Sequence, residues 1–155
     1  LGGKLFMISI GSDHAGYELK TKIETYLKSK SIEFEDVGTF NEESCDYPIF
    51  AEKASRLVSE GYCEKGILVC GSGVGMSIAA NKIKNIRAVL CFDAEIAALS
   101  RKHNNANILC LGGRFINLDS AIEIIDAFLN TPFEGGRHEK RIELIKNLEN
   151  KFGGK

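Results

Sequence analysis

The sequence predicts an α/β protein, a three-layer αβα sandwich around a five-stranded parallel sheet. Five short, β-rich apolar runs recur along the 155 residues, and segments with helical periodicity separate them. Strands that alternate with helices pair in parallel, because each helix returns the chain across a face of the sheet. Hydrophobic residues make up 44% of the chain, enough to build one full core at this length. The runs are "LFMISIG" (5–11), "IEFEDVG" (32–38), "GILVC" (66–70), "IRAVLC" (86–91) and "ANILCLGG" (106–113).

The segments between the runs have the spacing of amphipathic helices. In the first of them the lysines, including Lys20, lie off the apolar stripe, so we expect these lysines on the solvated face. Asp93 is a candidate N-cap of a later helix, and Asn117 or Asp119 of one that ends near Pro132. The apolar positions of the first helix are Ala15, Leu19, Ile23 and Leu27.

Charge and hydropathy exclude several classes of protein. Twenty basic residues stand against 21 acidic ones, with no basic stretch suited to nucleic acid or to anionic lipid. No apolar run approaches the ~20 residues that span a bilayer, and no signal peptide is recognisable. We therefore expect a cytoplasmic protein without nucleic-acid or membrane partners. Residues 1–6 resemble the remnant of an expression tag, with Met7 as the native start and 7–152 as a single domain.

Five cysteines occur without a Cys-x-x-Cys pair, so the sequence favours neither a zinc site nor a dithiol redox centre. Cys91 and Cys110 lie in strand-like runs, where a cysteine is a small buried apolar side chain. We expect free thiols throughout and no metal site.

The loop after the third run combines alternate glycines with a thiol. The segment "GILVCGSGVGMSIAANK" (66–82) leaves a buried strand, passes through glycines and enters a helix pattern. The N–H groups of such a loop and the dipole of the following helix attract negative charge. The spacing matches neither a dinucleotide fingerprint nor a Walker loop.

Glycines of this kind can serve only the close packing of strand and helix. The presence of Cys70 at the junction favours a catalytic role for the loop instead. The N–H groups and the dipole favour the thiolate, which makes Cys70 a usable base or nucleophile. A phosphatase thiol needs an arginine six residues later, and Met76 stands there. A thiol that accepts a carbon-bound proton, while backbone N–H groups stabilise the developing oxyanion, fits the residues present.

Further polar side chains follow the predicted strands. In an open parallel sheet, ligands bind beyond the carboxyl ends of the strands. Asp13 and His14 follow the first strand, Ser72 the third and Arg114 the fifth, so we expect them at one edge of the sheet. His103 ends the fourth helix in "RKHNN", where the simpler role is that of a cation favoured by the helix dipole.

The tail "EGGRHEKRIELIKNLENKF" (134–152) predicts a last helix with an apolar stripe. Arg137 and Arg141 are one turn apart, which suits a phosphate, with surface carboxylates as the alternative partners. The helical wheel places Arg141 on the buried face, where it needs an anionic partner. Because a sheet of five strands leaves no place for this helix, we expect it to pack on a partner subunit. Its stripe is Ile142, Ile145, Leu148 and Phe152.

The ordered set of motifs resembles the ribose-5-phosphate isomerase B family over almost the whole chain, from about residue 7 to residue 150. The resemblance implies a Rossmann-like αβα sandwich, a homodimer or dimer of dimers with the site shared between subunits, and a sugar-phosphate substrate. It also implies metal-independent aldose–ketose interconversion through a cis-enediolate, without a cofactor. The motifs are "GSDHAGYELK", "DYP" (46–48), the 66–82 segment, "IRAVLC", "SRKHNNANILCLGGR" and "FEGGRHEKRI".

The same resemblance implies roles in proton transfer. Cys70 is similar in position to the base that moves a proton between two sugar carbons, and Ser72 to its hydrogen-bonding helper. One branch of the family has a glutamate base at the position of Met76, and this chain belongs with the cysteine branch. The enediolate oxygen is expected on the N–H groups of Gly71, Gly73, Val74 and Gly75.

Roles in substrate binding are likewise implied by the resemblance. Asp13 and His103 match residues that open the furanose ring, and Tyr47 and Asn104 match residues that position hydroxyl groups. The phosphate is expected on His14, Arg114, Arg137 and Arg141.

Two alternatives to a ribose 5-phosphate isomerase stay open at this point. The same chemistry serves a six-carbon substrate such as allose or galactose 6-phosphate. The galactose relatives resemble two-chain enzymes that divide the catalytic residues, whereas this chain has the full set, which favours the pentose. A non-catalytic nucleotide-binding α/β module is the second alternative, and it needs no thiol.

Overall fold

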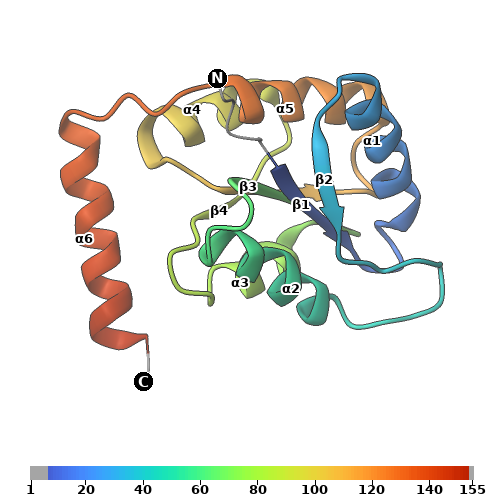
Figure 1. Ribbon diagram of the computed structural model, residues 1–155, viewed down its shortest axis with the longest axis horizontal. Helices are drawn as coiled ribbons and strands as arrows, with labels where there is room; N and C mark the ends of the chain where they lie inside the picture. Colours follow the sequence, from blue (N-terminus) through green and yellow to red (C-terminus); the bar gives the residue numbers. More distant parts are fainter. Residues whose placement is uncertain (1–6, 154–155) are drawn as a thin grey trace.

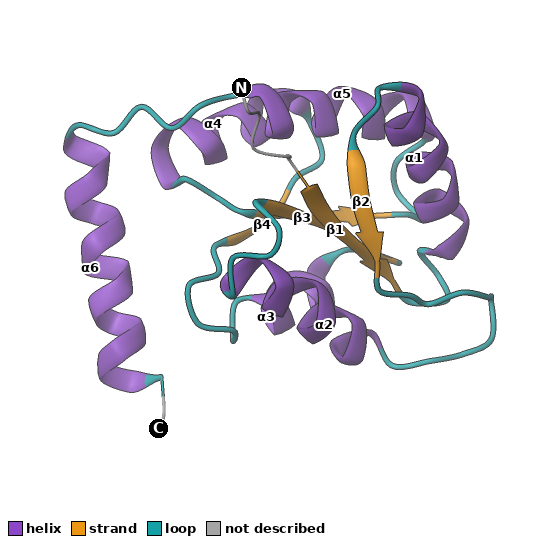
Figure 2. Cartoon of the chain, viewed as in Figure 1, coloured by secondary structure: helices purple, strands orange, loops and turns teal. Residues whose placement is uncertain are grey.

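Five parallel strands form one sheet in the order β2-β1-β3-β5-β4 (Figure 2). The structure is a computed structural model and describes residues 7–153, so the expected tag remnant at 1–6 lies outside the described residues. The predicted α/β sheet and all five of its strands are confirmed. The strands are β1 Met7–Ser12, β2 Glu33–Asp36, β3 Lys65–Cys70, β4 Ala88–Leu90 and β5 Ile108–Gly112.

Helices cover both faces of the sheet and complete the three predicted layers (Figure 1). On one face, α1 (Tyr17–Ser29), α4 (Ala94–Asn104) and α5 (Leu118–Asn130) bury their apolar sides against β1, β3 and β5. On the other face lie α2 (Tyr47–Ser59) and α3 (Val74–Ala80). The central strands β3 and β5 are buried almost throughout, as expected of strands covered on both sides.

Side-chain N-caps are confirmed at the predicted starts of α4 and α5. The Asp93 carboxylate accepts the N–H of Ile96 at the start of α4. Of the two candidates for α5, Asn117 is the cap, because its side-chain oxygen accepts the N–H of Ser120.

Lys20 contradicts the expected solvated face of α1, since it is only 1% exposed. Its ammonium lies 2.6 Å from the Asp36 carboxylate at the end of β2 and 3.4 Å from Glu24. The rings of Tyr17 and Phe40 flank it at 5.5 and 5.3 Å. The burial arises because strand β2 and the loop after it fold over the helix and supply the Asp36 carboxylate and the Phe40 ring, while α1 itself supplies Glu24 and Tyr17.

The last helix, α6 (Arg137–Phe152), stands off the sheet beside the β4 edge (Figure 1). It is attached at both ends: the Glu134 N–H donates to the Lys102 carbonyl, and the Glu149 carboxylate accepts the N–H of Asn85. Of its predicted stripe only Ile142 is buried, while Ile145, Leu148 and Phe152 are exposed.

Arg141 is exposed, so its expected burial is wrong for the described chain. Burial of Arg141 requires that the whole apolar stripe of α6 is covered. In the described chain the helix crosses past the sheet and contacts the other elements at few places.

Two further predictions concern membrane-spanning helices and the state of the cysteines. No helix in the 7–153 range is long and apolar enough to cross a membrane. All five cysteines are free, and Cys91 and Cys110 are fully buried.

Candidate active site

The strand order places a topological switch point at the carboxyl ends of β1 and β3. After β1 the chain continues to β2 on one side, and after β3 it continues toward β4 on the other side. The connections that leave the neighbouring strands β1 and β3 therefore run in opposite directions. Such a switch point is where open α/β sheets bind ligands. Asp13 and His14 follow β1, Cys70 ends β3 and Arg114 follows β5, and the structure brings these residues to one edge as predicted. We call this edge, with Tyr47 and the 70–75 loop, the rim.

Cys70 is held at the rim by its own backbone. Its carbonyl accepts the N–H of Gly113, which links the ends of β3 and β5 at 2.8 Å. Its sulfur accepts the N–H of Gly73 at 3.2 Å, and the residue is 5% exposed. A backbone N–H aimed at sulfur stabilises the thiolate, the form of cysteine that acts as a base.

The glycines of the loop have specific causes. Gly73 adopts a left-handed conformation with φ of 81°, which turns its N–H back toward Cys70. A Cβ on Gly75 would lie 2.5 Å from the ring of Tyr47, so only glycine lets that ring contact the start of α3. The loop therefore brings both a sulfur and a phenol to the same edge.

Two of the four N–H groups expected to hold an oxyanion already have partners in the loop. The N–H of Gly73 donates to the Cys70 sulfur, and the N–H of Val74 donates to the Ser72 hydroxyl at 3.2 Å. The Ser72 hydroxyl and the Cys70 sulfur thus lie on successive donors at the N-terminus of α3. The roles of Gly71, Gly73, Val74 and Gly75 toward an oxyanion stay predictions.

Asp13 and His14 are fixed by backbone donors. The Asp13 carboxylate is buried and accepts the N–H of Gly16 at 2.9 Å. The Nδ1 atom of His14 accepts the N–H of Cys45 at 3.2 Å. An imidazole whose Nδ1 accepts carries its proton on Nε2, so neutral His14 can donate from Nε2 to an anion.

Arg114 folds back over the glycine loop. Its N–H donates to the carbonyl of Gly71 at 3.0 Å. Its guanidinium lies so close to Gly71 that a Cβ there would be 3.1 Å from Nη1. The positive charge of Arg114 therefore lies against Gly71, the residue that follows Cys70.

The remaining predicted site residues lie on the side of the amino ends of the strands, opposite the rim. Helix α4 returns from the carboxyl end of β4 to the amino end of β5, so His103 and Asn104 end it far from the rim. The Nε of Arg87, directly before β4, donates to the Asn104 carbonyl at 3.0 Å. At about 3.3 Å per residue, the length of a strand such as β3 separates the two edges by roughly 15–20 Å.

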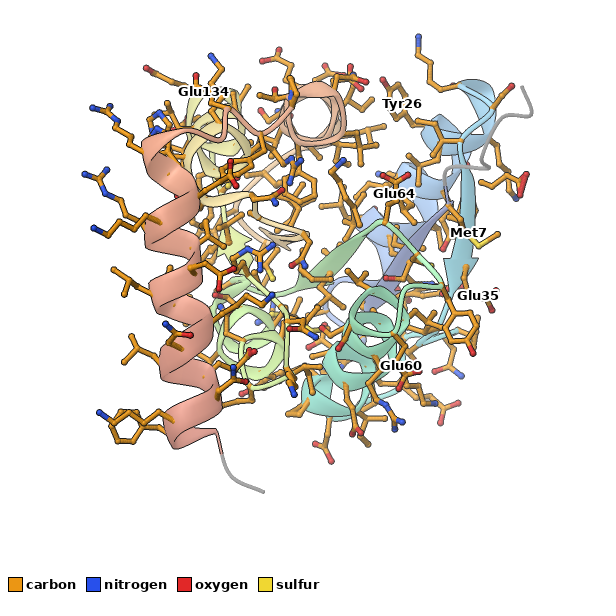
Figure 3. All side chains as sticks on the ribbon, turned by 60° about the vertical axis from the view of Figure 1, so that its left-hand side comes forward. Met7, Tyr26, Glu35, Glu60, Glu64 and Glu134 are labelled. Carbon is orange, nitrogen blue, oxygen red and sulfur yellow. The ribbon has the colours of Figure 1, made fainter. Side chains whose placement is uncertain are left out.

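His103 belongs to a second group of polar side chains. Its ring stacks on that of His138 with centroids 4.4 Å apart. The Nε2 of His138 lies 3.6 Å from the Glu134 carboxylate and that of His103 lies 4.0 Å from it. Figure 3 shows Glu134 on the segment that leads into α6, beside α4. We call His103, Glu134 and His138 the histidine cluster.

The histidine cluster brings Arg137 close to His103, because Arg137 directly precedes His138 at the start of α6. Partial burial and the positive charges of His103 and Arg137 hold the pKa of His138 below its ordinary value of 6.5. The sequence alone indicates no role for His138 or Glu134. Their i, i+4 spacing in "FEGGRHEK" is the signal that relates them to each other, but nothing local relates them to His103.

A groove of about 940 Å³ is formed by α6 and the segment between α3 and β4. Asn104, Arg87 and Leu148 are among its lining residues, and Cys70 is not. Within residues 7–153, the rim and the cluster are thus separate parts of one chain.

Sequence and structure comparisons agree on the relatives of this chain. Residues 8–145 match the Ribose/Galactose Isomerase family. Ribose-5-phosphate isomerase B of Escherichia coli K12 is 45% identical over 92% of this chain and 95% of its own length. The isomerase B structure from Clostridium thermocellum is 48% identical, with a TM-score of 0.94 over 95% of this chain and 99% of that one.

A third relative was solved with a ligand. The Mycoplasma genitalium ribose-5-phosphate isomerase B, with bound ribulose-5-phosphate, is 42% identical and has a TM-score of 0.91 over 96% of this chain and 99% of its own. The rim, the thiol at the end of β3 and these matches lead to one conclusion: the chain belongs to the Ribose/Galactose Isomerase family.

Proposed function

We propose that this protein is an aldose–ketose isomerase that interconverts D-ribose 5-phosphate and D-ribulose 5-phosphate in the non-oxidative pentose phosphate pathway. The observation that supports this most directly is the Cys70 sulfur, which accepts the Gly73 N–H at the rim beside Arg114. The relatives named for this reaction match over almost the whole chain, and one of them holds ribulose-5-phosphate.

The chemistry begins on the open-chain sugar, after Asp13 and His103 have moved the protons that open the furanose ring. The Cys70 thiolate takes the proton from C2, and the electrons of that C–H bond form the C1–C2 double bond while the carbonyl oxygen becomes the enediolate oxygen. The thiol then returns the proton to C1, and a proton moves from O2 to O1. Ser72 and the loop N–H groups stabilise the negative oxygen in this step.

The phosphate is distant from the reacting carbons and can hold the chain of the sugar in place. His14 offers an Nε2 donor and Arg114 a guanidinium at the rim. Arg137 and Arg141 supply two further cations, with Tyr47 and Asn104 on the hydroxyl groups. Binding energy from a remote phosphate lowers the barrier when it fixes the reacting carbons against the base.

A shared site in a homodimer, or a dimer of dimers, reconciles these roles with the structure. Rim and histidine cluster lie at opposite edges of the sheet, so one chain cannot bring His103 to Cys70. In a two-fold dimer each subunit can offer its α4 end and α6 to the rim of the other, which completes two sites at once. The exposed apolar side chains of α6 support such packing; they are Leu144, Ile145, Leu148 and Phe152.

The central role of Cys70 is tested by the turnover of Cys70→Ala. Loss of a general base costs on the order of 10³-fold in kcat. The matched control is Cys110→Ala, which removes a fully buried thiol from the neighbouring strand β5. If folded Cys70→Ala keeps near-normal turnover, Cys70 is not the base.

A panel of sugar phosphates separates the remaining alternatives. We expect the highest kcat/KM with ribose 5-phosphate and lower values with allose and galactose 6-phosphates. Calorimetry against nucleotides tests the non-catalytic alternative, since tight nucleotide binding without turnover of any sugar phosphate would contradict an isomerase. A cytoplasmic location remains a prediction from the sequence.

A further inference from the structure

The histidine cluster has the composition and spacing of a metal site. One ligand atom from each of His103, Glu134 and His138 lies within 4.8 Å of the others. The three side chains come from the end of α4, the segment after α5 and the first turn of α6. They converge although 35 residues of sequence separate the two histidines.

The cluster is held by backbone contacts on both sides. The N–H of Glu134 donates to the carbonyl of Lys102, directly before His103, at 3.1 Å. The N–H of His138 donates to the carbonyl of Gly135 at 3.1 Å, and His138 is only 7% exposed. The exposed Glu134 side chain is the adaptable member, while the two rings stack at an interplanar angle of 15°.

Two of the three ligands are imidazoles, whose borderline softness favours Zn²⁺, Ni²⁺ or Cu²⁺ over Mg²⁺ or Ca²⁺, which prefer oxygen ligands throughout. With bonds of about 2.0–2.1 Å, the ligand atoms of a tetrahedral zinc ion lie roughly 3.3 Å apart. To bind one ion, the two rings have to rotate out of their stack so that their lone pairs converge, and the Glu134 side chain has to turn toward them.

We propose that His103, Glu134 and His138 bind one divalent transition-metal ion of the zinc type, and that the bound ion inhibits the isomerase. The ion takes the lone pair of His103 and is thus an inhibitor, not a cofactor. Metal binding is independent of the proposed function, whereas the inhibitory consequence rests on it, because it depends on the role of His103 in opening the sugar ring.

Binding is tested first, with the full chain freed of metal by a chelator. Zn²⁺ affinity is measured by competition with a chromophoric chelator, and Co²⁺ serves as a spectroscopic probe. We expect one site per chain and a Co²⁺ spectrum without a sulfur charge-transfer band. Glu134→Gln and His138→Gln should each weaken Zn²⁺ binding by more than the ~10–100-fold that loss of an outer-shell partner costs.

Two controls make the binding result specific. Glu139→Gln removes a neighbouring exposed carboxylate of α6 and should leave Zn²⁺ affinity unchanged. Cys70→Ala should also keep the site, because no sulfur belongs to the histidine cluster. A thiolate spectrum that Cys70→Ala abolishes, or equal Zn²⁺ affinity in wild type and Glu134→Gln, would overturn the proposal.

Inhibition is measured next, for each variant relative to its own activity in chelator. We expect Zn²⁺ to inhibit the wild type and Glu139→Gln at the concentration that fills the site, and to require at least tenfold more for Glu134→Gln. Equal sensitivity of all three would overturn the inhibitory role. If the chain has no isomerase activity in chelator, the proposed function fails while the binding experiment still decides the metal site.

Discussion

The rim and the histidine cluster differ in how the chain holds them. At the rim, the sheet fixes each side chain through main-chain contacts: Cys70 is bonded to β5 and to Gly73, and Asp13 to Gly16. The cluster lies where the end of α4 meets the start of α6, and the two arginines beside it sit on α6, which leaves the sheet and keeps most of its surface exposed (Figure 1). The groups proposed to move protons at carbon are preorganised at the rim, together with His14 and Arg114, whereas the other two proposed phosphate ligands, Arg137 and Arg141, lie on α6 away from the rim.

After the loss of Cys70 itself, the largest expected effect is also at the rim, where one added carbon can break the fit of Tyr47 against Gly75. Gly75→Ala adds a Cβ 2.5 Å from the Tyr47 ring, which displaces the ring or the loop. We expect kcat to fall by about 10²-fold, since misplacement by 1 Å costs that much. The control is Gly113→Ala, whose added carbon lies no closer than 3.5 Å to its neighbours. Equal turnover in the two variants would show that the rim tolerates displacement.

A smaller effect is expected from α6, which we call the arm, and it should appear in KM instead of kcat. Arg137→Ala removes an exposed guanidinium, so the fold of the chain should be unaffected. Loss of a charge-assisted hydrogen bond of about 1.5–3 kcal/mol raises KM by roughly 10–100-fold. Lys140→Ala, exposed on the same helix, is the control and should have a normal KM. An unchanged KM in Arg137→Ala would leave the arm a purely structural role.

The smallest effect concerns the buried charges that support the β2 end of the rim. Burial, and a hydrogen bond with Asp36, raise the pKa of Glu24 to about 7. The folded chain therefore keeps a proton that the unfolded chain releases above pH 4.5. Stability from this group is present below that pH and is lost as pH rises toward 7.

Chemical denaturation at pH 5 and at pH 8 measures this effect. We expect the free energy of unfolding of the wild type to fall more between these values than that of Glu24→Gln. Glu18→Gln, which removes an exposed carboxylate of the same helix, should behave as the wild type does. A wild-type slope in Glu24→Gln would mean that Glu24 titrates normally.

The sequence predicts what depends on local pattern. Alternating strands and helices, the cap at Asp93 and the rim residues after β1, β3 and β5 all follow from short segments and the geometry of parallel sheets. Lys20 could not be placed in this way, because its carboxylate and ring partners come partly from β2 and the loop after it. The stacking of His103 on His138 depends on the path of the chain between α5 and α6, which has no periodic signal.

The central claim is that each site combines the rim of one subunit with the α4 end and arm of the other. It is tested most directly by co-expressing Cys70→Ala and His103→Ala chains with different affinity tags and purifying the mixed dimer. Each parent homodimer should be inactive, and the mixed dimer, which contains one intact site of two, should have about half of the wild-type activity per dimer. A mixed dimer as inactive as its parents would contradict the shared site.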